Sequence, residues 1–159
     1  MGAAGCGKST VAAATAQVLQ MQLVEGDDFH SANNRQKMSR GLPLNDDDRD
    51  NWLATLCQEL QKSPQGIVLT CSALKRKYRD RLRDASPGLR FIFLDLTCEQ
   101  AQERVIARAA HFFSADLVAS QFAVLESPVG EPHVLRVDAT EDLFSLVQTI
   151  VQYSLAHGV

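Results

Sequence analysis

Short apolar runs alternate along the chain with stretches in which apolar residues recur at helical spacing. The runs predict strands at Gln22–Glu25, Ile67–Cys71, Phe91–Leu96 and Val134–Val137. The helical stretches predict helices at Lys8–Gln20, Ala32–Ser39, Trp52–Lys62, Lys75–Arg83, Glu99–Arg108, Asp116–Leu125 and Glu141–Tyr153. The run Ile67–Cys71 is apolar without interruption, which is typical of a strand covered on both faces. Strands that alternate with helices predict an α/β protein with a parallel sheet in a three-layer α/β/α arrangement.

Length, charge and cysteine usage narrow the class of protein. A chain of 159 residues suits a single domain, which we expect to span residues 1–159. The formal net charge of -3 carries no signature of nucleic-acid or acidic-membrane binding, and no apolar run is long enough to span a membrane. None of the 4 cysteines forms a C-x-x-C pair, which favours reduced thiols. We therefore expect a cytoplasmic protein whose partners are neither nucleic acids nor membranes.

The first residues of the chain, Gly2–Ser9, match the pattern G-x-x-x-x-G-K-[ST] at every required position. Glycines let the backbone wrap around phosphate oxygens, and the predicted helix behind them directs its positive N-terminal end at the same place. Lys8 can then reach the β- and γ-phosphates of ATP, and the Ser9 hydroxyl can ligate Mg²⁺. The expected ATP-binding residues of this loop are Gly2, Ala3, Ala4, Gly5, Cys6, Gly7, Lys8, Ser9 and Thr10. The motif predicts a P-loop NTPase fold.

Only Met1 precedes this loop, although a phosphate loop of this kind follows a buried parallel strand. A central strand usually has about 5–6 residues, and each buried aliphatic side chain contributes roughly 1.5–3 kcal/mol. We therefore expect that the natural polypeptide starts upstream and that its first strand is missing from this chain.

Two acidic residues, Glu25 and Asp27, follow a predicted strand, where ligands bind in open α/β sheets. Acidic groups at this place can hold the water shell of a metal and accept a proton from a substrate hydroxyl. The strand Ile67–Cys71 ends without the aspartate that usually helps to hold magnesium. Magnesium would then rest on Ser9, phosphate oxygens, and water held by Glu25 or Asp27. A solvated acidic turn is the alternative, but the phosphate loop favours a functional role for at least one carboxylate.

Two basic residues lie next to predicted elements that should border the site. Arg49 precedes the helix at Trp52, which we expect Asn45 or an aspartate to cap, with Asp48 the favoured one. Its guanidinium suits a carboxylate ligand, and a surface ion pair is equally compatible with the sequence. Lys75 follows a strand end and should lie at the same edge of the sheet.

Arg104 and Arg108 are four residues apart and share one face of a predicted helix. Their place after the strand at Phe91 suits a helical lid, spanning about residues 104–128, whose arginines neutralise developing phosphoryl charge. The alternative is that both are surface arginines that pair with Glu99 or Glu103. We favour a lid role for at least one of them.

Further segments occur in a specific order along nearly the whole chain. They are Gly2–Ser9; Gly26-Asp27 with His30, Asn34, Lys37 and Met38; Gly41-x-Pro43-Leu44-Asn45-Asp46-x-Asp48-Arg49 with Trp52-Leu53; Cys71-Ser72-Ala73-Leu74-Lys75 with Tyr78-Arg79; and Arg104, Arg108, His111-Phe112, Gln121-Phe122, Leu125-Glu126 and Pro128. Together they resemble the gluconokinase family of small P-loop kinases. The resemblance implies a shikimate-kinase-like fold, a cytoplasmic homodimer, and transfer of the ATP γ-phosphoryl group to the 6-hydroxyl of D-gluconate. The product, 6-phosphogluconate, would feed the pentose phosphate or Entner–Doudoroff route.

The resemblance also implies roles for single residues. Asp27 would orient or deprotonate the 6-hydroxyl, and Glu25, where the family pattern carries Asp, would help to hold metal-bound water. The residues expected to bind the substrate are Asp27, His30, Asn34, Arg49 and Lys75. Arg104 and Arg108 would serve the nucleotide and the lid, and the loop that includes Asp138 would border adenine. Lys8, Asp27 and Arg108 are the expected catalytic residues.

Three other readings remain open from the sequence. A kinase of the same fold could act on shikimate or a nucleoside monophosphate, although the gluconokinase-like segments argue against it. A nucleotide-binding switch would need an N-K-x-D and a D-x-x-G motif, and the chain carries neither. An inactive nucleotide-binding fragment is favoured only by the missing strand.

Overall fold

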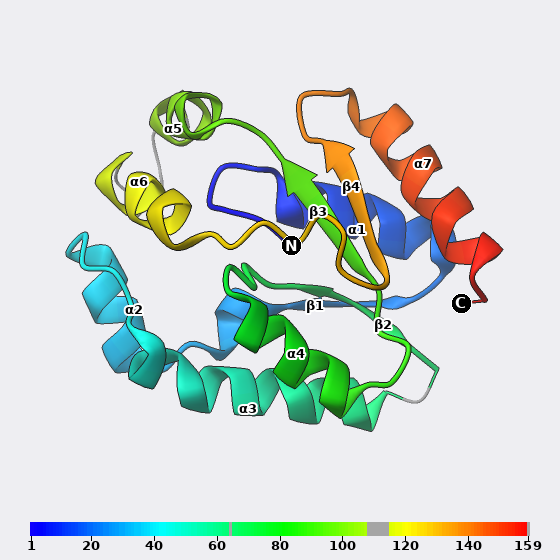
Figure 1. Cartoon of the computed structure of the whole chain (residues 1–159), viewed down its shortest axis with the longest axis horizontal. Helices are drawn as coiled ribbons and strands as arrows, with labels where there is room; N and C mark the ends of the chain where they lie inside the picture. Colours follow the sequence, from blue (N-terminus) through cyan, green and yellow to red (C-terminus); the bar gives the residue numbers. More distant parts are fainter. Residues whose placement is uncertain (64, 108–114, 159) are drawn as a thin grey trace.

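The computed structural model describes residues 1–63, 65–107 and 115–158 (Figure 1). In chain order the elements are α1 (Lys8–Leu19), β1 (Gln22–Glu25), the short 3-10 helix η1 (Gly26–Phe29), α2 (Ala32–Ser39), α3 (Asp46–Lys62), β2 (Ile67–Thr70), α4 (Arg76–Ala85), β3 (Phe91–Asp95), α5 (Cys98–Ala107), α6 (Ala115–Val124), β4 (Val134–Asp138) and α7 (Leu143–Ala156). The predicted order of strands and helices is confirmed, and η1 is an addition to it.

Helix α3 begins at Asp46, six residues before the predicted start at Trp52. The reason is a capping box. The Asn45 side chain accepts a hydrogen bond from the Asp48 backbone N–H (2.8 Å), and the Asp48 carboxylate accepts one from the Asn45 N–H (3.0 Å). Asn45, one of the expected candidates, is therefore the N-cap, and the preference for Asp48 is wrong. Asp48 is the reciprocal partner one turn inside.

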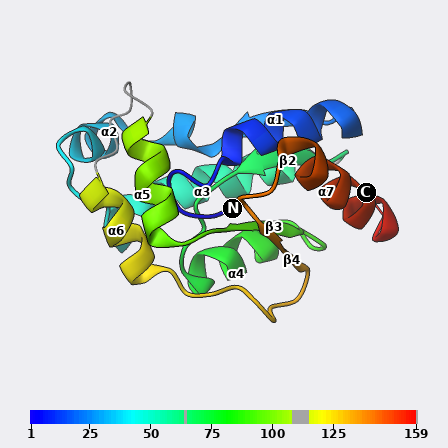
Figure 2. The same cartoon turned by 90° about the horizontal axis from the view of Figure 1, so that it is seen from above.

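All strands are parallel, but they form two separate pairs. In one pair, β1 runs beside β2, with Glu25 opposite Thr70; in the other, β3 runs beside β4, with Asp95 opposite Asp138. The predicted parallel α/β arrangement is thus confirmed, with its sheet divided into two halves. Helices cover both faces, and Figure 2 shows α1 and α4 on opposite sides of the strands.

Two apolar clusters form most of the core. The first lies where α3 and α4 pack on the strands, with Trp52, Leu56 and Leu82 almost wholly buried. The second joins α1 and α7 to β3 and β4 through Val11, Leu94 and Ile150. Full burial of one such side chain stabilises the fold by roughly 1.5–3 kcal/mol. The helices contact both halves of the sheet, because the first cluster also includes Phe91 of β3 and α1 also contacts β1 and β2.

Met1 and Gly2 lie between the two halves (Figure 1). The Met1 amino group donates to the Ile92 carbonyl (2.6 Å), the Leu94 N–H donates to the Met1 carbonyl (3.0 Å), and the Gly2 N–H donates to the Ser72 carbonyl (3.3 Å). These two residues therefore join β3 to the end of β2. The expectation of further chain upstream of Met1 stays a prediction.

In the described part of the chain, no helix is long and apolar enough to cross a membrane. Helices α5 and α6 pack against each other in the region where the lid is expected. Arg108, predicted to lie in this lid, falls outside the described residues.

Candidate active site

The phosphate loop takes the backbone shape that its glycines allow. Gly5 and Gly7 have φ values of 84° and 91°, in the left-handed region that favours glycine. A Cβ atom on Gly5 would also lie 2.6 Å from the Ala101 carbonyl of α5. Gly7 is the N-cap of α1, so the amide groups that begin this helix open toward the loop. This loop can hold an anion in the way the sequence predicts.

A cavity of about 160 Å³ lies in front of the phosphate loop. It brings together residues from the loop, η1, α2, α3, α5 and α6: Ala4, Gly5, Gly7, Lys8, Ser9, Thr10, Asp27, His30, Met38, Leu44, Arg49, Ser72, Val105 and Gln121. Of the predicted site residues, Lys8, Ser9, Asp27, His30 and Arg49 thus share one cavity. Gly2, Ala3 and Cys6 are buried behind it.

The Lys8 ammonium lies within this cavity, against its own loop. Its Nζ atom donates to the carbonyl oxygens of Gly2 and Ala3, both at 3.1 Å. These contacts hold a positive charge at the mouth of the loop, where phosphate oxygens are expected.

Three oxygen-bearing side chains are linked next to the loop. The Ser9 hydroxyl donates to Glu25 Oε2 (3.1 Å), and the Thr70 hydroxyl donates to the same oxygen (2.6 Å). Thr70 also accepts from the Gly26 N–H (3.1 Å), so it fixes both the carboxylate and the turn after β1. Hydroxyl and carboxylate oxygens are the ligands that Mg²⁺ prefers, usually with water between. The donor set fits magnesium, while the described residues hold no cluster of three carboxylate, histidine or cysteine ligands.

Thr70 was not among the predicted site residues. It lies opposite Glu25 in the β1–β2 register. The only signal in the sequence is that a threonine ends the strand that follows the acidic turn. The β1–β2 register is needed to see that this threonine lies beside Glu25. The Thr70 hydroxyl lies at the end of the strand that lacks the aspartate which usually helps to hold magnesium.

Asp27 and His30 face the cavity from η1 and the residue that follows it. The Asp27 side chain is 64% exposed, and its Oδ1 lies 3.8 Å from His30 Nε2. His30 is buried, and burial lowers the pKa of its imidazole below the ordinary 6.5. At pH 7 the ring is therefore neutral. The exposed Asp27 side chain is open to a ligand.

Arg49 is the most informative side chain of the cavity. It is only 8% exposed, yet no hydrogen bond or ion pair to its guanidinium is found within the described residues. The guanidinium carbon lies 5.9 Å from the centre of the Tyr78 ring, which supports it from one side. A buried guanidinium without an anionic partner can take a carboxylate from a ligand. The surface ion pair, one of the two alternatives that the sequence left open for Arg49, is absent among the described residues.

Lys75 and Asn34 do not line the cavity, although both were predicted to bind the substrate. Lys75 Nζ is bonded to Asp46 Oδ1 (2.8 Å). Asn34 is buried and donates to the Asp48 carbonyl (2.6 Å), which fastens α2 to α3. The Lys75 amine and the Asn34 amide thus hydrogen-bond to other elements of the fold.

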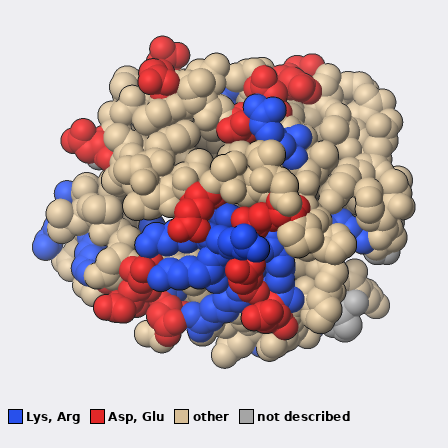
Figure 3. Space-filling view, in the orientation of Figure 1, with Lys and Arg blue, Asp and Glu red and all other residues tan. Residues whose placement is uncertain are grey.

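Asp46 is a second residue that sequence reasoning missed. It also accepts from Lys77 (2.6 Å) and from the Tyr78 hydroxyl, and these hydrogen bonds with Lys75 hold the pKa of its carboxyl far below the usual range. Figure 3 shows this mixed group of basic and acidic side chains over α4. The only earlier signal was the place of Asp46 in the family-like segment.

The predicted nucleotide residues outside the loop lie near the end of β4. Arg104 Nη2 donates to the Ala139 carbonyl (2.8 Å), and Asp138 accepts from the Thr140 N–H (2.9 Å) and hydroxyl (2.6 Å). The alternative pairing of Arg104 with Glu99 or Glu103 is absent among the described residues. Arg104 of α5 thus contacts the loop that follows Asp138, and neither residue lines the cavity of Asp27 and Arg49.

Gln121 of α6 was not predicted to act in the site either. Its Oε1 accepts from the Ala4 N–H of the phosphate loop (2.7 Å). Ala4 and Gln121 are 117 residues apart in the sequence, so no sequence motif includes both of them. The bond ties the lid region to the loop that it would cover.

Comparisons with known proteins show the family of the chain. A family model described as an AAA domain matches residues 1–131. A probable gluconokinase of Schizosaccharomyces pombe is 46% identical over 140 residues, which cover 82% of this chain and 72% of the relative. The thermosensitive gluconokinase of Escherichia coli is 38% identical over 160 residues, covering 98% of this chain and 86% of the relative.

Solved structures give the same answer. A gluconokinase from Sinorhizobium meliloti superimposes with a TM-score of 0.89 and 41% identity, covering 96% of this chain and 87% of the other. An APS kinase of Mycobacterium tuberculosis has a TM-score of 0.68 at 18% identity, which shows only that the two proteins have the same fold. The phosphate loop, the cavity in front of it and these relatives together lead to one assignment: the chain is a P-loop kinase that belongs to the gluconokinase family.

Proposed function

We propose that this enzyme transfers the γ-phosphoryl group of ATP to the 6-hydroxyl of D-gluconate and releases 6-phospho-D-gluconate and ADP. One observation carries the choice of substrate: the buried side chain of Arg49, which has no hydrogen bond or ion pair within residues 1–63, 65–107 and 115–158, shares a cavity with Asp27 and the phosphate loop. Gluconate has a carboxylate at one end and a primary hydroxyl at the other. The cavity offers a group suited to each.

Within this proposal, the roles follow from position. Arg49 binds the gluconate carboxylate, and Asp27 orients the 6-hydroxyl and accepts its proton as the oxygen attacks phosphorus. Lys8 stabilises the charge on the transferred phosphoryl group. Neutral His30 lines the cavity beside Asp27 and can hydrogen-bond a sugar hydroxyl.

Ser9 would bind the magnesium ion directly, and Glu25, held by Thr70, would bind its water shell. When bound, the metal neutralises charge on the phosphate oxygens. The chain's own part is to fix the Ser9 hydroxyl and the Glu25 carboxylate on one side of the phosphate loop.

Further roles extend the proposal beyond the cavity. Arg104 and Asp138 would border the nucleotide base, and Arg108 would act from the lid. Lys75 and Asn34 would not contact the substrate. They would hold in place the elements that carry the substrate-binding residues. We also infer that the enzyme works as a homodimer in the cytoplasm, which sedimentation and cell fractionation can test.

A coupled assay tests the function. The purified protein receives Mg-ATP and D-gluconate, and 6-phosphogluconate is read through its dehydrogenase, with shikimate and a nucleoside monophosphate in parallel reactions that follow ADP. Lys8→Ala is the matched inactive control. Turnover confined to gluconate and lost in the variant supports the proposal. Faster turnover of shikimate or the nucleotide would replace it.

A further inference from the structure

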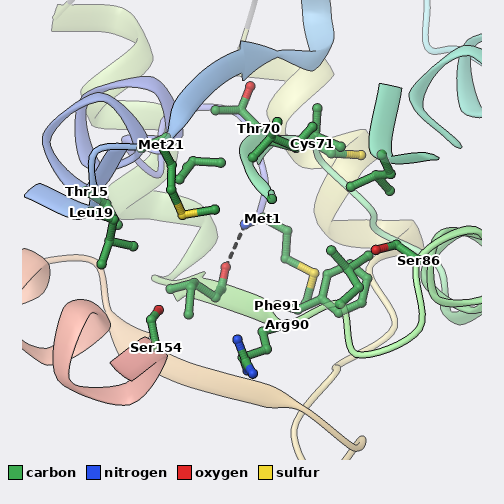
Figure 4. Close-up of a pocket in the computed structure, with 18 of the residues that line it drawn as sticks. Met1, Thr15, Leu19, Met21, Thr70, Cys71, Ser86, Arg90, Phe91 and Ser154 are labelled. Carbon is green, nitrogen blue, oxygen red and sulfur yellow. Dashed lines mark hydrogen bonds between the residues drawn. The ribbon is translucent and has the colours of Figure 1, made fainter. Parts of the chain in front are cut away.

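The Lys8 side chain lines two cavities of the enzyme. The larger one, of about 420 Å³, lies around Met1 between β2 and β3, and Figure 4 shows it with Thr70 and Phe91 at its walls. The smaller one, of about 160 Å³, is the candidate active site in front of the phosphate loop. Of these two cavities, Gln121 of α6 lines the smaller, and the proposed mechanism gives this side chain no role.

The orientation of the Gln121 amide is fixed by its partner. The Ala4 backbone N–H can only donate, so the atom that it meets at 2.7 Å must be the oxygen Oε1 of the side chain and not the nitrogen Nε2. Nε2 is bonded to the same carbon as Oε1 and is therefore held beside the phosphate loop. It carries two N–H groups, and neither donates to any other residue that the structure describes. Two N–H donors are thus held at the cavity without an acceptor.

Gln121 and Lys8 bond to the same peptide group of the loop. Ala4 supplies its N–H to Gln121, and the Ala3 carbonyl of the same peptide accepts from Lys8 Nζ at 3.1 Å. The carbonyl and N–H of a trans peptide point in opposite directions, so the two side chains meet this peptide from its two sides. A lysine at this position of a phosphate loop reaches the β- and γ-phosphates. The Gln121 amide therefore lies at the part of the loop where the terminal phosphates are expected.

Apolar packing holds α6 against the phosphate loop. Val118, one turn before Gln121 and on the same face of α6, is 0% exposed. It forms a cluster with Ala101 and Val105 of α5, and Ala4 of the loop packs against this cluster. The position of the Gln121 amide thus depends on the same contacts that fix the loop.

Two hydrogen bonds anchor the chain just after α6. The Glu126 N–H donates to the Leu74 carbonyl (2.9 Å), and the Glu126 carboxylate accepts from the Arg76 N–H at the start of α4 (2.5 Å). Gln121 therefore lies near an end of α6 that is fastened to a different part of the fold. A donor that is fixed before the reaction needs no reorganisation when charge develops in the transition state.

We propose that Gln121 donates from Nε2 to an oxygen of the γ-phosphoryl group of bound ATP. The amide then distinguishes ATP from ADP, because only ATP carries the group that it contacts. It also stabilises negative charge on this group during transfer, together with Lys8. The inference rests on the proposed use of ATP as the phosphoryl donor and is independent of which sugar acid accepts the group.

Nucleotide titrations without any sugar acid test the proposal. The probes are ADP and β,γ-imido-ATP, each with saturating Mg²⁺, and isothermal titration calorimetry measures their affinities. Gln121→Glu keeps an oxygen for the Ala4 N–H and replaces the amine with a second oxygen. Gln121→Met keeps the length of the side chain and removes both polar ends. The matched control is Gln100→Glu, because Gln100 Oε1 also accepts a backbone N–H, from Thr97 (2.8 Å), but does not line the cavity.

We expect both Gln121 variants to bind β,γ-imido-ATP at least about tenfold more weakly than the parent, since each loses a hydrogen bond to a charged group. The loss should be larger for Gln121→Glu, whose charge repels the phosphate. The affinity for ADP should stay within about threefold of the parent, and Gln100→Glu should bind both nucleotides as the parent does. Thermal unfolding of each variant checks that the fold persists.

Each alternative role of Gln121 gives a different result. If the side chain only ties α6 to the loop, Gln121→Glu binds β,γ-imido-ATP with parental affinity. If only the new charge matters, Gln121→Met does so. If the substitutions distort the loop, the affinity for ADP falls as much as that for β,γ-imido-ATP. Any of these three results would overturn the proposal.

The coupled gluconate assay separates this inference from the proposed function. A parent that shows the expected nucleotide affinities but does not turn over gluconate would reject the sugar acid and leave the role of Gln121 in place. A parent that binds neither nucleotide would reject both.

Discussion

The imidazole ring of His30 stacks on the indole ring of Trp52, with centroids 4.5 Å apart and planes inclined by 13°. The same indole donates from Nε1 to the Gly26 carbonyl (2.7 Å). Trp52 is itself buried in the core, so it fixes the His30 ring and the turn that carries Asp27 at once. The position of the proposed proton acceptor therefore depends on core packing beneath it.

Asp27→Asn tests the role of that carboxylate. We expect kcat to fall by about 100-fold or more, because the amide cannot accept the hydroxyl proton, while the affinity for ATP stays close to that of the parent. Steady-state kinetics and nucleotide titration measure both quantities. Asp28→Asn, an exposed neighbour in the same turn, is the matched control. Near-parental turnover by Asp27→Asn would refute the assigned role.

Arg49→Ala tests carboxylate recognition. Loss of a charge-assisted, two-pronged contact of about 2–3 kcal/mol raises the KM for gluconate by roughly 30- to 150-fold and leaves the KM for ATP unchanged. Arg49→Lys keeps the charge without the planar fork and should recover only part of the loss. Thermal unfolding of both variants checks that the fold persists. An unchanged KM for gluconate would assign Arg49 a structural role.

Glu25→Gln tests the proposed magnesium site. We expect the affinity for Mn²⁺ in the presence of a non-hydrolysable nucleotide to fall about tenfold, since an outer carboxylate of this kind typically contributes 10- to 100-fold. Electron paramagnetic resonance of free Mn²⁺ gives this number without any turnover. Thr70→Val removes the bond that orients Glu25 and should give a smaller loss in the same direction. Equal Mn²⁺ affinity in parent and Glu25→Gln would exclude this role.

Glu131→Gln tests the buried ion pair beneath the loop 72–75. Arg79 is 0% exposed and donates to Glu131 and to the carbonyls of Ala73 and Leu74; its hydrogen bonds lower the pKa of Glu131. Removing the carboxylate leaves a buried positive charge, so the free energy of unfolding should fall by about 3–5 kcal/mol. Urea denaturation measures it.

The matched control for that experiment is Glu59→Gln, which breaks the exposed pair of Glu59 with Lys62. Surface pairs of this kind contribute about 0–1 kcal/mol. If the two variants lose the same stability, the Arg79–Glu131 pair does not hold the loop.

The buried amine of Met1 makes stability depend on pH. Its pKa is lowered to about 6 in the folded protein from 8.0, so the unfolded chain takes up a proton first as the pH falls. The free energy of unfolding should therefore decrease from pH 8 to pH 6, by about 2–3 kcal/mol, and His30, whose pKa is also lowered by burial, adds to the loss below 6.5. Urea titrations at pH 8.5, 7.5 and 6.5 measure the slope. Acetylation of the amine should flatten it, and an unchanged slope would contradict this origin.

The sequence predicts the order of elements well, because strands such as Phe91–Asp95 are continuous apolar runs that only a buried strand explains. It places the start of α3 wrongly, because Asp46–Asp48 carry no apolar periodicity and the capping box alone decides where the helix begins. Local pattern therefore suffices where burial dominates. It fails where a single pair of polar side chains sets the boundary.

For the site, the sequence brings Lys8, Asp27 and Arg49 together correctly because each follows a strand or a motif that points to one edge of the sheet. It misplaces Lys75, since the choice between a ligand and Asp46 depends on a partner 29 residues away. Thr70 and Gln121 were missed for the same reason. Their roles depend on register and on packing between distant elements.

In the proposed mechanism, the divided sheet separates the residues for substrate from those for nucleotide. The half with β1, β2 and α3 carries Asp27 and Arg49, whereas the half with β3 and β4 carries Arg104 and Asp138. Helix α1, behind the phosphate loop, contacts β1, β2 and α7 and so spans the seam. The proposed mechanism therefore makes the in-line alignment of the acceptor oxygen and the γ-phosphorus depend on how the two halves of the sheet are positioned on α1.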